Sequence, residues 1–549
     1  MCKYRDPLTP APTKNELEMQ AIRSRIEDVF NLVSIQSLDR LDPNYVIMGS
    51  SKGYSAIGHY QYPMDECLIS RSWRMEFPFM TIQTPSTMCL LGLDPKLSAK
   101  LVVAERTNPS MMTPPTFPDE SSLLYGEAIS AFGYFYCRMQ HWYPVLHPEF
   151  FSSYLENVGN NSGTSTDHCL VLIVAAIGSA CRSLPPAAIH SEHQDRGYIM
   201  KALAMLHNVH SEFSLRSAQC LLLLAVYYNC IGRPCQAHDF VLMASCKTQA
   251  LFKCHLYDDD DRPMELLRRI FWSTLLMETE LGYHMDMPES NIWKFDDRIL
   301  LPGIHDSWEP FHENQRYMFE QSEPIGLSAL TSNDTKAYFL AAISMCRMMR
   351  RCFASVVLFN NKEVYAPIIA NELGNQLEKW HEHLPSSLKF DRQRRFSVPT
   401  DVTTSFSATG GSSSQAAVTR FLEMQFYQCL ISTFWPAVYS ILYLDDAPET
   451  TLADCSRFFD AYVCLVSSIS TTIDSCPNTP WNFYASLFIT TLSAYKGAQA
   501  PCLRHAMSPT IVSCFQAAKS MFKNGDAAMQ SPSLVMMGEI LSQYINAVS

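Results

Sequence analysis

Four consecutive aspartates, Asp258–Asp261, are the side chains of this sequence whose type and spacing most directly suggest chemistry. Clustered carboxylates can hold Mg²⁺, and bound Mg²⁺ can grip the phosphates of a substrate. The usual pattern for that chemistry is Asp-Asp-x-x-Asp within a helix that faces a cavity, with a second polar triad on a facing helix. Here the fifth position is Arg262, and the nearest triad, "NDTK" at 333–336, lacks the later Ser and Glu. A metal-dependent, all-α enzyme of the terpene-synthase type is therefore the least favoured class.

The same aspartates suit the start of a helix. Pro263 is tolerated in a first helical turn, where its missing N–H is not needed, so the sequence predicts a helix that begins near 262–263. Carboxylates at that end cap free N–H groups and interact favourably with the helix dipole, by about 0.3–1 kcal/mol each. Two adjacent apolar stripes follow, formed by Ile270, Met277 and Leu281 and by Leu267, Phe271 and Leu275. They predict a wide-faced, buried helix.

The remaining reactive side chains show no catalytic or metal-binding pattern. The nineteen cysteines include no Cys-x-x-Cys, and the closest pairs, Cys230/Cys235 and Cys346/Cys352, are too widely spaced for a zinc knuckle. The histidines of "QHWYPVLHP" and "KWHEHLP" have no acid–base partner at a known spacing. Phosphate-binding loops, Gly-x-Ser-x-Gly and His-Glu-x-x-His are absent from the sequence. We therefore expect buried thiols, structural histidines, no catalytic or cofactor-binding residues and no enzyme.

Composition narrows the classes further. Hydrophobic residues make up 47% and charged residues 17% of the chain, which is typical of a globular protein. The net charge of −12 means that any contact with DNA has to come from a small basic module or from a partner. The longest apolar runs, 169–181 and 220–231, are shorter than the roughly 20 residues of a spanning helix, and the first residues lack a signal-peptide core. We expect a soluble, intracellular protein without membrane contact.

The elements that must position these side chains are helical. From about residue 121 the apolar residues recur with helical spacing, strand alternation is nearly absent, and no period of 20–50 residues marks a repeat array. Helices are predicted at 122–140, 148–157, 166–182, 195–210, 214–231, 234–252, 263–283, 335–358, 362–383, 418–444, 450–474, 480–497, 508–523 and 532–547, with a breaker-rich loop at 384–417. The fold class is therefore all-α.

One predicted helix carries a basic cluster. Arg347, Arg350 and Arg351 fall within about one turn. They could bind an acidic partner, but a solvated helix face is the favoured interpretation. The abundance of Met, Cys and aromatic residues could likewise line an apolar effector pocket, although ordinary core packing is favoured for any one of them.

The N-terminal segment contains a short heptad pattern. Apolar residues recur at spacings of three and four, with charges between them, at Met19, Ile22, Ile26, Val29 and Val33. Two or three heptads can pair weakly in a coiled coil, so these residues are the expected dimer seam. An amphipathic helix on the core is the equally weighted alternative. Residues 37–120, rich in Gly, Pro, Ser and Thr, suggest a connector that docks on the body.

The helix after the aspartates resembles a known family. "ELLRRIFWSTLLMETELGYHMDMPESNI" contains Arg268, Arg269, Phe271 and Trp272 in the arrangement Arg-Arg-x-Phe-Trp that characterises the middle homology region of fungal-specific transcription factors. The family's Gly-x-Pro follows only loosely, because Gly282 and Pro288 stand further apart than usual. Upstream, "YFYCRMQHWYPVLHPEFF" resembles the family's opening segment and includes His147 and Pro148.

Other segments resemble the family in the correct order. They are 214–256, "FDDRILLP" at 295–302, "LEKWHEHLPSSLKF" at 377–390 and "FLEMQFYQCLISTFWPAVY" at 421–439. Each is weak alone, but six in order are specific, and together they cover about 121–500. Trp435 stands where the family commonly has Arg.

The resemblance extends to the N-terminus. Cys2, Tyr4 and Pro7 are similar to the exit of a zinc binuclear cluster, in which six cysteines hold two zinc ions and the last is followed by a linker and a coiled coil. The other five cysteines are not in this sequence, and Cys2 alone cannot form the cluster, because each zinc ion needs about four ligands. Two interpretations stay open: a gene prediction that begins at the last cysteine, with zinc as cofactor, or a cluster-less protein that acts through an intact partner.

The resemblance thus implies a nuclear regulator of RNA polymerase II transcription, plausible for a metabolic or secondary-metabolite gene cluster. It implies a homo- or heterodimer that reaches promoter DNA through a missing or partner zinc cluster and acts on the transcription machinery. The implied organisation is a zinc-cluster remnant at 1–15, a coiled coil at 16–36, a docking linker at 37–120, a regulatory domain at 121–395, a flexible loop at 396–417 and the C-terminal part of the same body at 418–549.

Overall fold

The computed structural model of the chain describes most of the region from residue 85 to residue 546. The described residues are 85–107, 125–159, 165–182, 194–285, 287–303, 308–320, 329–354, 357–359, 362–392, 414–444, 448–473, 476, 478, 480–524 and 531–546. The chain divides into Met1–Met64, which lies outside them, and Asp65–Ser549, which contains all of them. Cys2 and the expected dimer seam, Met19, Ile22, Ile26, Val29 and Val33, therefore lie outside the described residues.

The described part is all-α, as predicted, apart from one short hairpin. Its α-helices are α2 (Pro85–Leu90), α3 (Leu97–Thr107), α5 (Tyr125–Arg138), α6 (Phe150–Gly159), α7 (Thr166–Arg182), α8 (Gln194–Ala204), α9 (Leu206–Ser211), α10 (Leu215–Cys230), α11 (Pro234–Lys253), α12 (Asp261–His284), α13 (Tyr317–Glu320), α14 (Ser332–Ala354), α15 (Pro367–Glu382), α16 (Ser414–Leu444), α17 (Glu449–Thr472), α18 (Pro480–Ala498), α19 (Ile511–Asn524) and α21 (Pro532–Asn546). The hairpin pairs β1 (Val357–Phe359) with β2 (Lys362–Val364) in antiparallel fashion.

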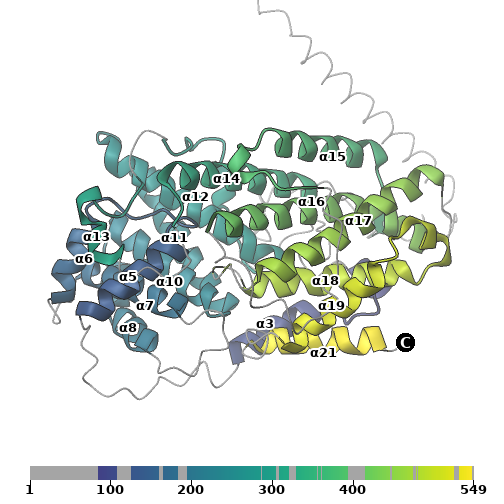
Figure 1. Cartoon of the computed structure of the whole chain (residues 1–549), viewed down its shortest axis with the longest axis horizontal. Helices are drawn as coiled ribbons and strands as arrows, with labels where there is room; N and C mark the ends of the chain where they lie inside the picture. The colour runs from purple at the N-terminus through teal and green to yellow at the C-terminus, as the bar shows by residue number, and fades with distance from the viewer. Residues whose placement is uncertain are drawn as a thin grey trace, which may run out of the picture. The chain divides into compact units, whose positions relative to one another are not determined.

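Two groups of helices make up the body (Figure 1). In the first, α7 contacts α5, α8 and α10, and α11 lies between α10 and α12. The apolar run of α7 has no polar face, which explains why the helix is buried on nearly all sides. A Cβ at Gly178 would lie 1.9 Å from the Ala131 carbonyl oxygen, so only glycine allows α5 and α7 to approach this closely.

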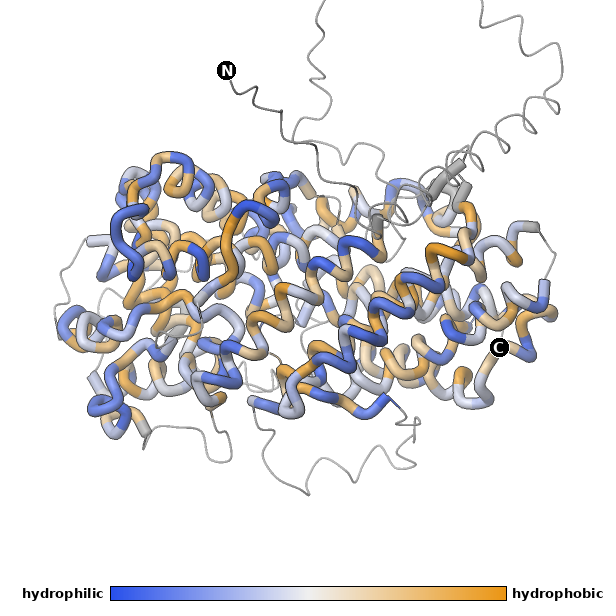
Figure 2. The backbone as a smooth tube through the Cα atoms, turned by 90° about the horizontal axis from the view of Figure 1, so that it is seen from above, coloured by the Kyte–Doolittle hydropathy of each residue, from blue (hydrophilic) through white to orange (hydrophobic). Residues whose placement is uncertain are grey.

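In the second group, α16 and α17 pack along their lengths, and α18, α19 and α21 pack against one another. The long helices α12, α14 and α18 join the two groups, because α12 contacts both α14 and α18. The buried hydrophobic side chains form one continuous core. Figure 2 shows the corresponding mixture of hydrophobic and hydrophilic positions along most helices.

Helix α3 attaches the described part of the connector to this body. Arg106 makes a bidentate contact with Asp239 of α11, at 2.9 and 2.8 Å. The fully buried Glu105 accepts hydrogen bonds from Ser533 N at 3.1 Å and Ser533 Oγ at 2.6 Å, at the start of α21. A buried carboxylate needs such donors, so these contacts fix α3 between two distant helices.

The structure departs from the predicted elements in three places. The region 195–210, which was predicted as one helix, forms the two helices α8 and α9, because the helix is interrupted at Met205. The helix predicted at 335–358 ends before the hairpin, and the helix predicted at 362–383 begins after it. The β-branched and aromatic sequence "VVLFNNKEV" favours strands between them. Helix α15 starts only at Pro367, which suits a first helical position.

Candidate functional site

The aspartate run starts a helix. Asp260 is the N-cap residue of α12, and its carboxylate accepts a hydrogen bond from Arg262 N at 3.1 Å. Asp258 bonds instead to the ring of His255, with 2.7 Å between Oδ2 and Nδ1. Across the ranges that the structure describes, no group of three or more His, Cys, Asp or Glu side chains could hold a metal ion. The capping interpretation of the run is confirmed for Asp260, and both predicted apolar stripes of α12 are buried.

Arg269 is the buried centre of the Arg-Arg-x-Phe-Trp motif. It is 3% exposed, and its Nη1 donates to the Pro144 carbonyl oxygen at 2.9 Å. Its guanidinium lies over the Trp308 ring, 5.4 Å from the centroid, and its Nε lies 4.0 Å from Glu265 Oε1. Glu265 also accepts from Gly303 N at 2.9 Å. Arg269 thus connects α12 to the segment before α6 and to the chain beyond residue 300.

Arg268 is more exposed than Arg269 and makes weaker contacts. Its side chain is one quarter exposed, and its Nη1 lies 3.7 Å from Glu265 Oε2. That separation is an ion pair rather than a hydrogen bond, and partly solvated pairs of this kind contribute little to stability. The two arginines of the motif are therefore not equivalent.

Trp272 lies about one turn further along the same helix. Its indole Nε1 donates to the Leu300 carbonyl oxygen at 3.0 Å, and Arg347 of α14 lies over its ring at 5.1 Å from the centroid. Phe271 packs edge-on against Trp272, with ring centroids 5.3 Å apart. Arg347 also donates to the Asp296 carbonyl oxygen at 2.8 Å. Glu265, Arg269, Trp272 and Arg347 together are called the motif brace below.

The upstream motif residues belong to the same frame. His147 is half-buried in a close pair with Glu149, and burial nevertheless lowers the pKa of this imidazole. Pro148 is also only partly exposed. The neighbouring Val145 carbonyl oxygen accepts from Gln219 of α10. The loop that carries these residues is therefore bound to α10 through Val145 and to α12 through Pro144.

The predicted solvated face of the basic cluster is wrong for two of its arginines. Arg347 is engaged in the motif brace, and the guanidinium of Arg350 lies 4.4 Å from the centroid of the Trp293 ring, in η3 (Ile292–Phe295). Arg351 is exposed. The periodicity of a single helix could not reveal this, because both tryptophans come from other segments.

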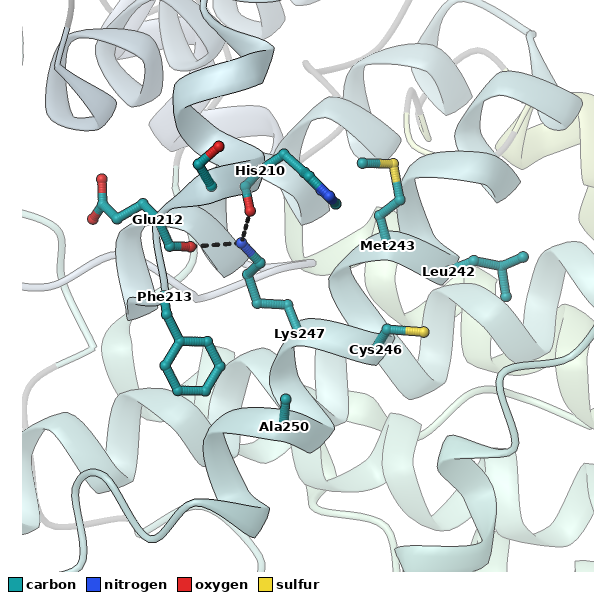
Figure 3. Close-up of a pocket in the computed structure, with 9 residues that line it drawn as sticks. His210, Glu212, Phe213, Leu242, Met243, Cys246, Lys247 and Ala250 are labelled. Atoms are coloured by element: carbon teal, nitrogen blue, oxygen red, sulfur yellow. Dashed lines mark hydrogen bonds between the residues drawn. The ribbon is translucent and has the colours of Figure 1, made fainter.

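An apolar groove lies beside the corner between α9 and α10 (Figure 3). Its volume is about 500 Å³. It is lined by His210, Ser211, Glu212, Phe213, Leu242, Met243, Cys246, Lys247 and Ala250. Phe213 is 45% exposed, which is unusual for an aromatic side chain in an otherwise well-packed body. The sequence analysis missed this groove, because its two walls are separate helices.

The charged residues of the groove are already engaged. Lys247 Nζ donates to the carbonyl oxygens of His210 at 2.7 Å and Glu212 at 2.6 Å, at the C-terminus of α9 (Figure 3). Burial lowers the pKa of Lys247, although Glu212 partly opposes this shift. The Glu212 carboxylate accepts instead from the hydroxyls of Thr166 and Ser214. The groove is thus suited to apolar contact rather than to binding a charged ligand through these two groups.

The cysteine in this groove is a poor nucleophile. Cys246 is exposed, but burial of its thiol and the nearby Glu278 carboxyl raise its pKa. Since the thiolate is the reactive form, such a thiol is less reactive at neutral pH than an ordinary cysteine. The geometry therefore gives the groove no evident catalytic group.

The comparisons with known proteins match the region that contains these motif residues. Residues 133–382 match the sequence model of the fungal specific transcription factor domain. This range contains all six motif residues, His147, Pro148, Arg268, Arg269, Phe271 and Trp272. This match identifies residues 133–382 as a fungal specific transcription factor domain.

One curated relative aligns over nearly the whole chain. It comes from Aspergillus rugulosus, is described as "Putative transcription factor ecdB", and is 29% identical over 561 aligned residues. The alignment covers 99% of this chain and 92% of the relative. No solved structure matches the chain significantly.

The zinc cluster implied by the family does not fit the residues at hand. Of its six cysteines the sequence supplies Cys2, which lies outside the described residues. A binuclear cluster needs about four ligands for each ion, and one thiol cannot supply them. No helix in the described ranges is long and apolar enough to cross a membrane.

Proposed function

We propose that the helical body is the regulatory part of a nuclear transcription regulator and that it does not itself contact DNA. The observation that carries this proposal is that Arg269 of the motif and two arginines of the basic cluster contact groups inside the body. Arg269 bonds to Pro144, Arg347 bonds to Asp296, and Arg350 lies over a tryptophan. Phosphate contacts require basic groups that are free at the surface. The net charge of −12 also supports a body that does not itself bind the phosphates of DNA.

A tethering assay tests the regulatory role. The full chain is fused to an unrelated DNA-binding domain, and transcription of a reporter with matching sites is measured in a fungal host. We expect a several-fold change relative to the DNA-binding domain alone. Arg269→Met should abolish the change by weakening the motif brace, whereas Arg268→Met should preserve it. If the fusion is present in the nucleus but reporter transcription neither rises nor falls relative to the DNA-binding domain alone, the regulatory role is contradicted.

We propose that DNA is reached through pairing. The expected seam, centred on Ile26, would join this chain to a second copy or to a partner, and the zinc cluster would come from the partner or from an N-terminal extension of this chain. Ile26→Ala should lower the molar mass in solution toward that of a monomer. An unchanged mass rules out this seam. Mapping the 5′ end of the transcript distinguishes the two sources of the cluster.

We propose further that the protein has no catalytic activity and that its target genes form a metabolic or secondary-metabolite gene cluster. The capping geometry of Asp260 supports the first part, because a carboxylate bonded to the helix end is not arranged to hold Mg²⁺. Mg²⁺-dependent turnover of a prenyl diphosphate by the full chain would disprove it. Transcript profiling after gene deletion tests the second part, for which a clustered set of affected genes is the expected result.

A further inference from the structure

Helix α3 is joined to the C-terminal helix α21 by one buried carboxylate. Glu105 is fully buried, and its Oε1 atom accepts three hydrogen bonds from residues at the start of α21. The donors are Ser531 Oγ, Ser533 N and Ser533 Oγ. Figure 1 shows the two helices side by side. N–H and O–H donors at the positive end of a helix dipole suit a carboxylate, so the start of α21 holds α3 by its charge.

This attachment leaves the carboxylate incompletely bonded. The second oxygen of Glu105, Oε2, is buried and finds no hydrogen-bond partner in the part of the chain that the structure describes. The neighbouring cation, Arg106, pairs with Asp239 of α11 instead. Burial of a charge is costly where its hydrogen bonds are incomplete and no counter-charge is paired with it. Desolvation of Glu105 therefore opposes the docking of α3, and the three donors offset this cost.

The apolar contacts of α3 are few. Of its 11 residues, the buried ones are Leu97, Ser98, Leu101 and Glu105, so two leucines are its only large apolar side chains that are fully buried. Val103 is 55% exposed. Helices of this length are marginal in water on their own, and segments with few buried apolar contacts open locally at a low free energy. Helix α3 therefore depends on the donors around Glu105 to stay docked and folded.

We propose that α3 is a releasable strap, which residues 531–533 hold on the body through Glu105 and which opens when these donors are withdrawn, while the rest of the body stays folded. The described end of the connector is thus held conditionally, because a change at the start of α21 decides whether α3 is docked. This inference goes beyond the proposed function, since it concerns the attachment of α3 and not transcription. It is measured without DNA or a reporter, so its failure and a failure of the proposed function are distinguishable.

Ser531 is the donor to remove. Its hydroxyl donates to Glu105 and accepts from Leu534 N at 3.4 Å. Ser533 is less suitable, because its hydroxyl also accepts from the buried Trp481 Nε1 at 2.8 Å, and the indole would lose its acceptor. Ser531→Ala leaves Glu105 with the two donors of Ser533. Loss of a hydrogen bond to a buried charge should raise the open fraction of α3 roughly tenfold to a hundredfold.

Trypsin digestion of the full chain, followed by mass spectrometry, measures the release. Lys100 lies in the middle of α3 with an exposed side chain, so trypsin can cut after it when the helix opens. Arg269, which is buried in α12, reports the opening of the whole body. We expect Ser531→Ala to be cut after Lys100 at least about tenfold faster than the wild type, with the bond after Arg269 still protected.

A second substitution separates the charge of Glu105 from other effects of Ser531→Ala. Glu105→Gln, added to Ser531→Ala, keeps an acceptor for Ser533 but removes the buried charge. It should bring cleavage after Lys100 back to within about threefold of the wild type, because an amide is less costly than a carboxylate to leave incompletely bonded. Loss of the bond from Leu534 N cannot explain such a recovery, since that bond stays absent in the double variant.

Asp239→Asn is the matched control variant. It removes the ion pair of the adjacent Arg106, whose partners are both partly exposed, and leaves the sequence of α3 unchanged. Exposed pairs contribute little, so cleavage after Lys100 should change by less than about fivefold. The proposal is overturned if Ser531→Ala and the wild type are cut after Lys100 at equal rates, or if the bond after Arg269 becomes equally labile, because α3 would then open only with the whole body. It is equally overturned if Glu105→Gln fails to slow the cleavage of Ser531→Ala.

Discussion

Replacing Arg269 with methionine should destabilise the protein far more than the same change at Arg268. Arg269→Met keeps much of the apolar volume but removes the donor to the Pro144 carbonyl oxygen and the charge beside Glu265. Removing one member of a buried, hydrogen-bonded ion pair costs about 3–5 kcal/mol, and Glu265 keeps only its contacts with Arg268 and Gly303 N. Arg268→Met removes a partly solvated pair and should cost about 0–1 kcal/mol. The difference is a large fraction of the roughly 5–15 kcal/mol that stabilises a typical domain.

Urea unfolding followed by tryptophan fluorescence measures this difference. Trp272 and Trp308 both lie at the motif brace, so their emission reports on its loss. We expect the unfolding midpoint of Arg269→Met to fall well below that of Arg268→Met, with similar slopes. Equal midpoints for the two variants, or a cost below about 1 kcal/mol for Arg269→Met, would refute the view that the motif is an internal brace.

Three further predictions concern other sites. Burial lowers the pKa of His141 to about 3. Because the same imidazole binds its proton near pH 6.5 in the unfolded chain, the free energy of unfolding should fall as the pH drops from about 6.5 toward 3. His141→Gln should make this fall less steep in urea unfolding experiments across the same pH range. Gly178→Ala should lower the melting temperature because of the Ala131 carbonyl, whereas Gly126→Ala, whose Cβ meets nothing within 4 Å, should not. Lys247→Met should cost about 1 kcal/mol and speed hydrogen exchange in α9, since the carbonyls at its end lose their donor; unchanged exchange there would contradict the capping role.

The motif brace shows how the body holds its shape. It joins α12 to the loop before α6 and to α14 through charged side chains, because Arg269 donates to the Pro144 carbonyl oxygen and Arg347 to the Asp296 carbonyl oxygen.

The sequence by itself determined the helices and the family. Helical periodicity is a local property, so α7, α10 and α12 could be predicted nearly to the residue, and Pro263 indicated that the aspartate run starts a helix. The ordered motif segments likewise pointed to the domain that residues 133–382 match. Both depend on residues that are neighbours along the chain.

Only the tertiary structure decided what the polar side chains do. Arg269 finds its acceptor 125 residues upstream, Arg347 finds a tryptophan on another helix, and Glu280 faces Gln425 across the body. Periodicity within one helix tells which face is apolar, but it cannot tell which distant carbonyl, ring or amide will lie opposite a charge. The hairpin at 357–364 shows the same limit, because strand pairing depends on a partner segment that one short window does not contain.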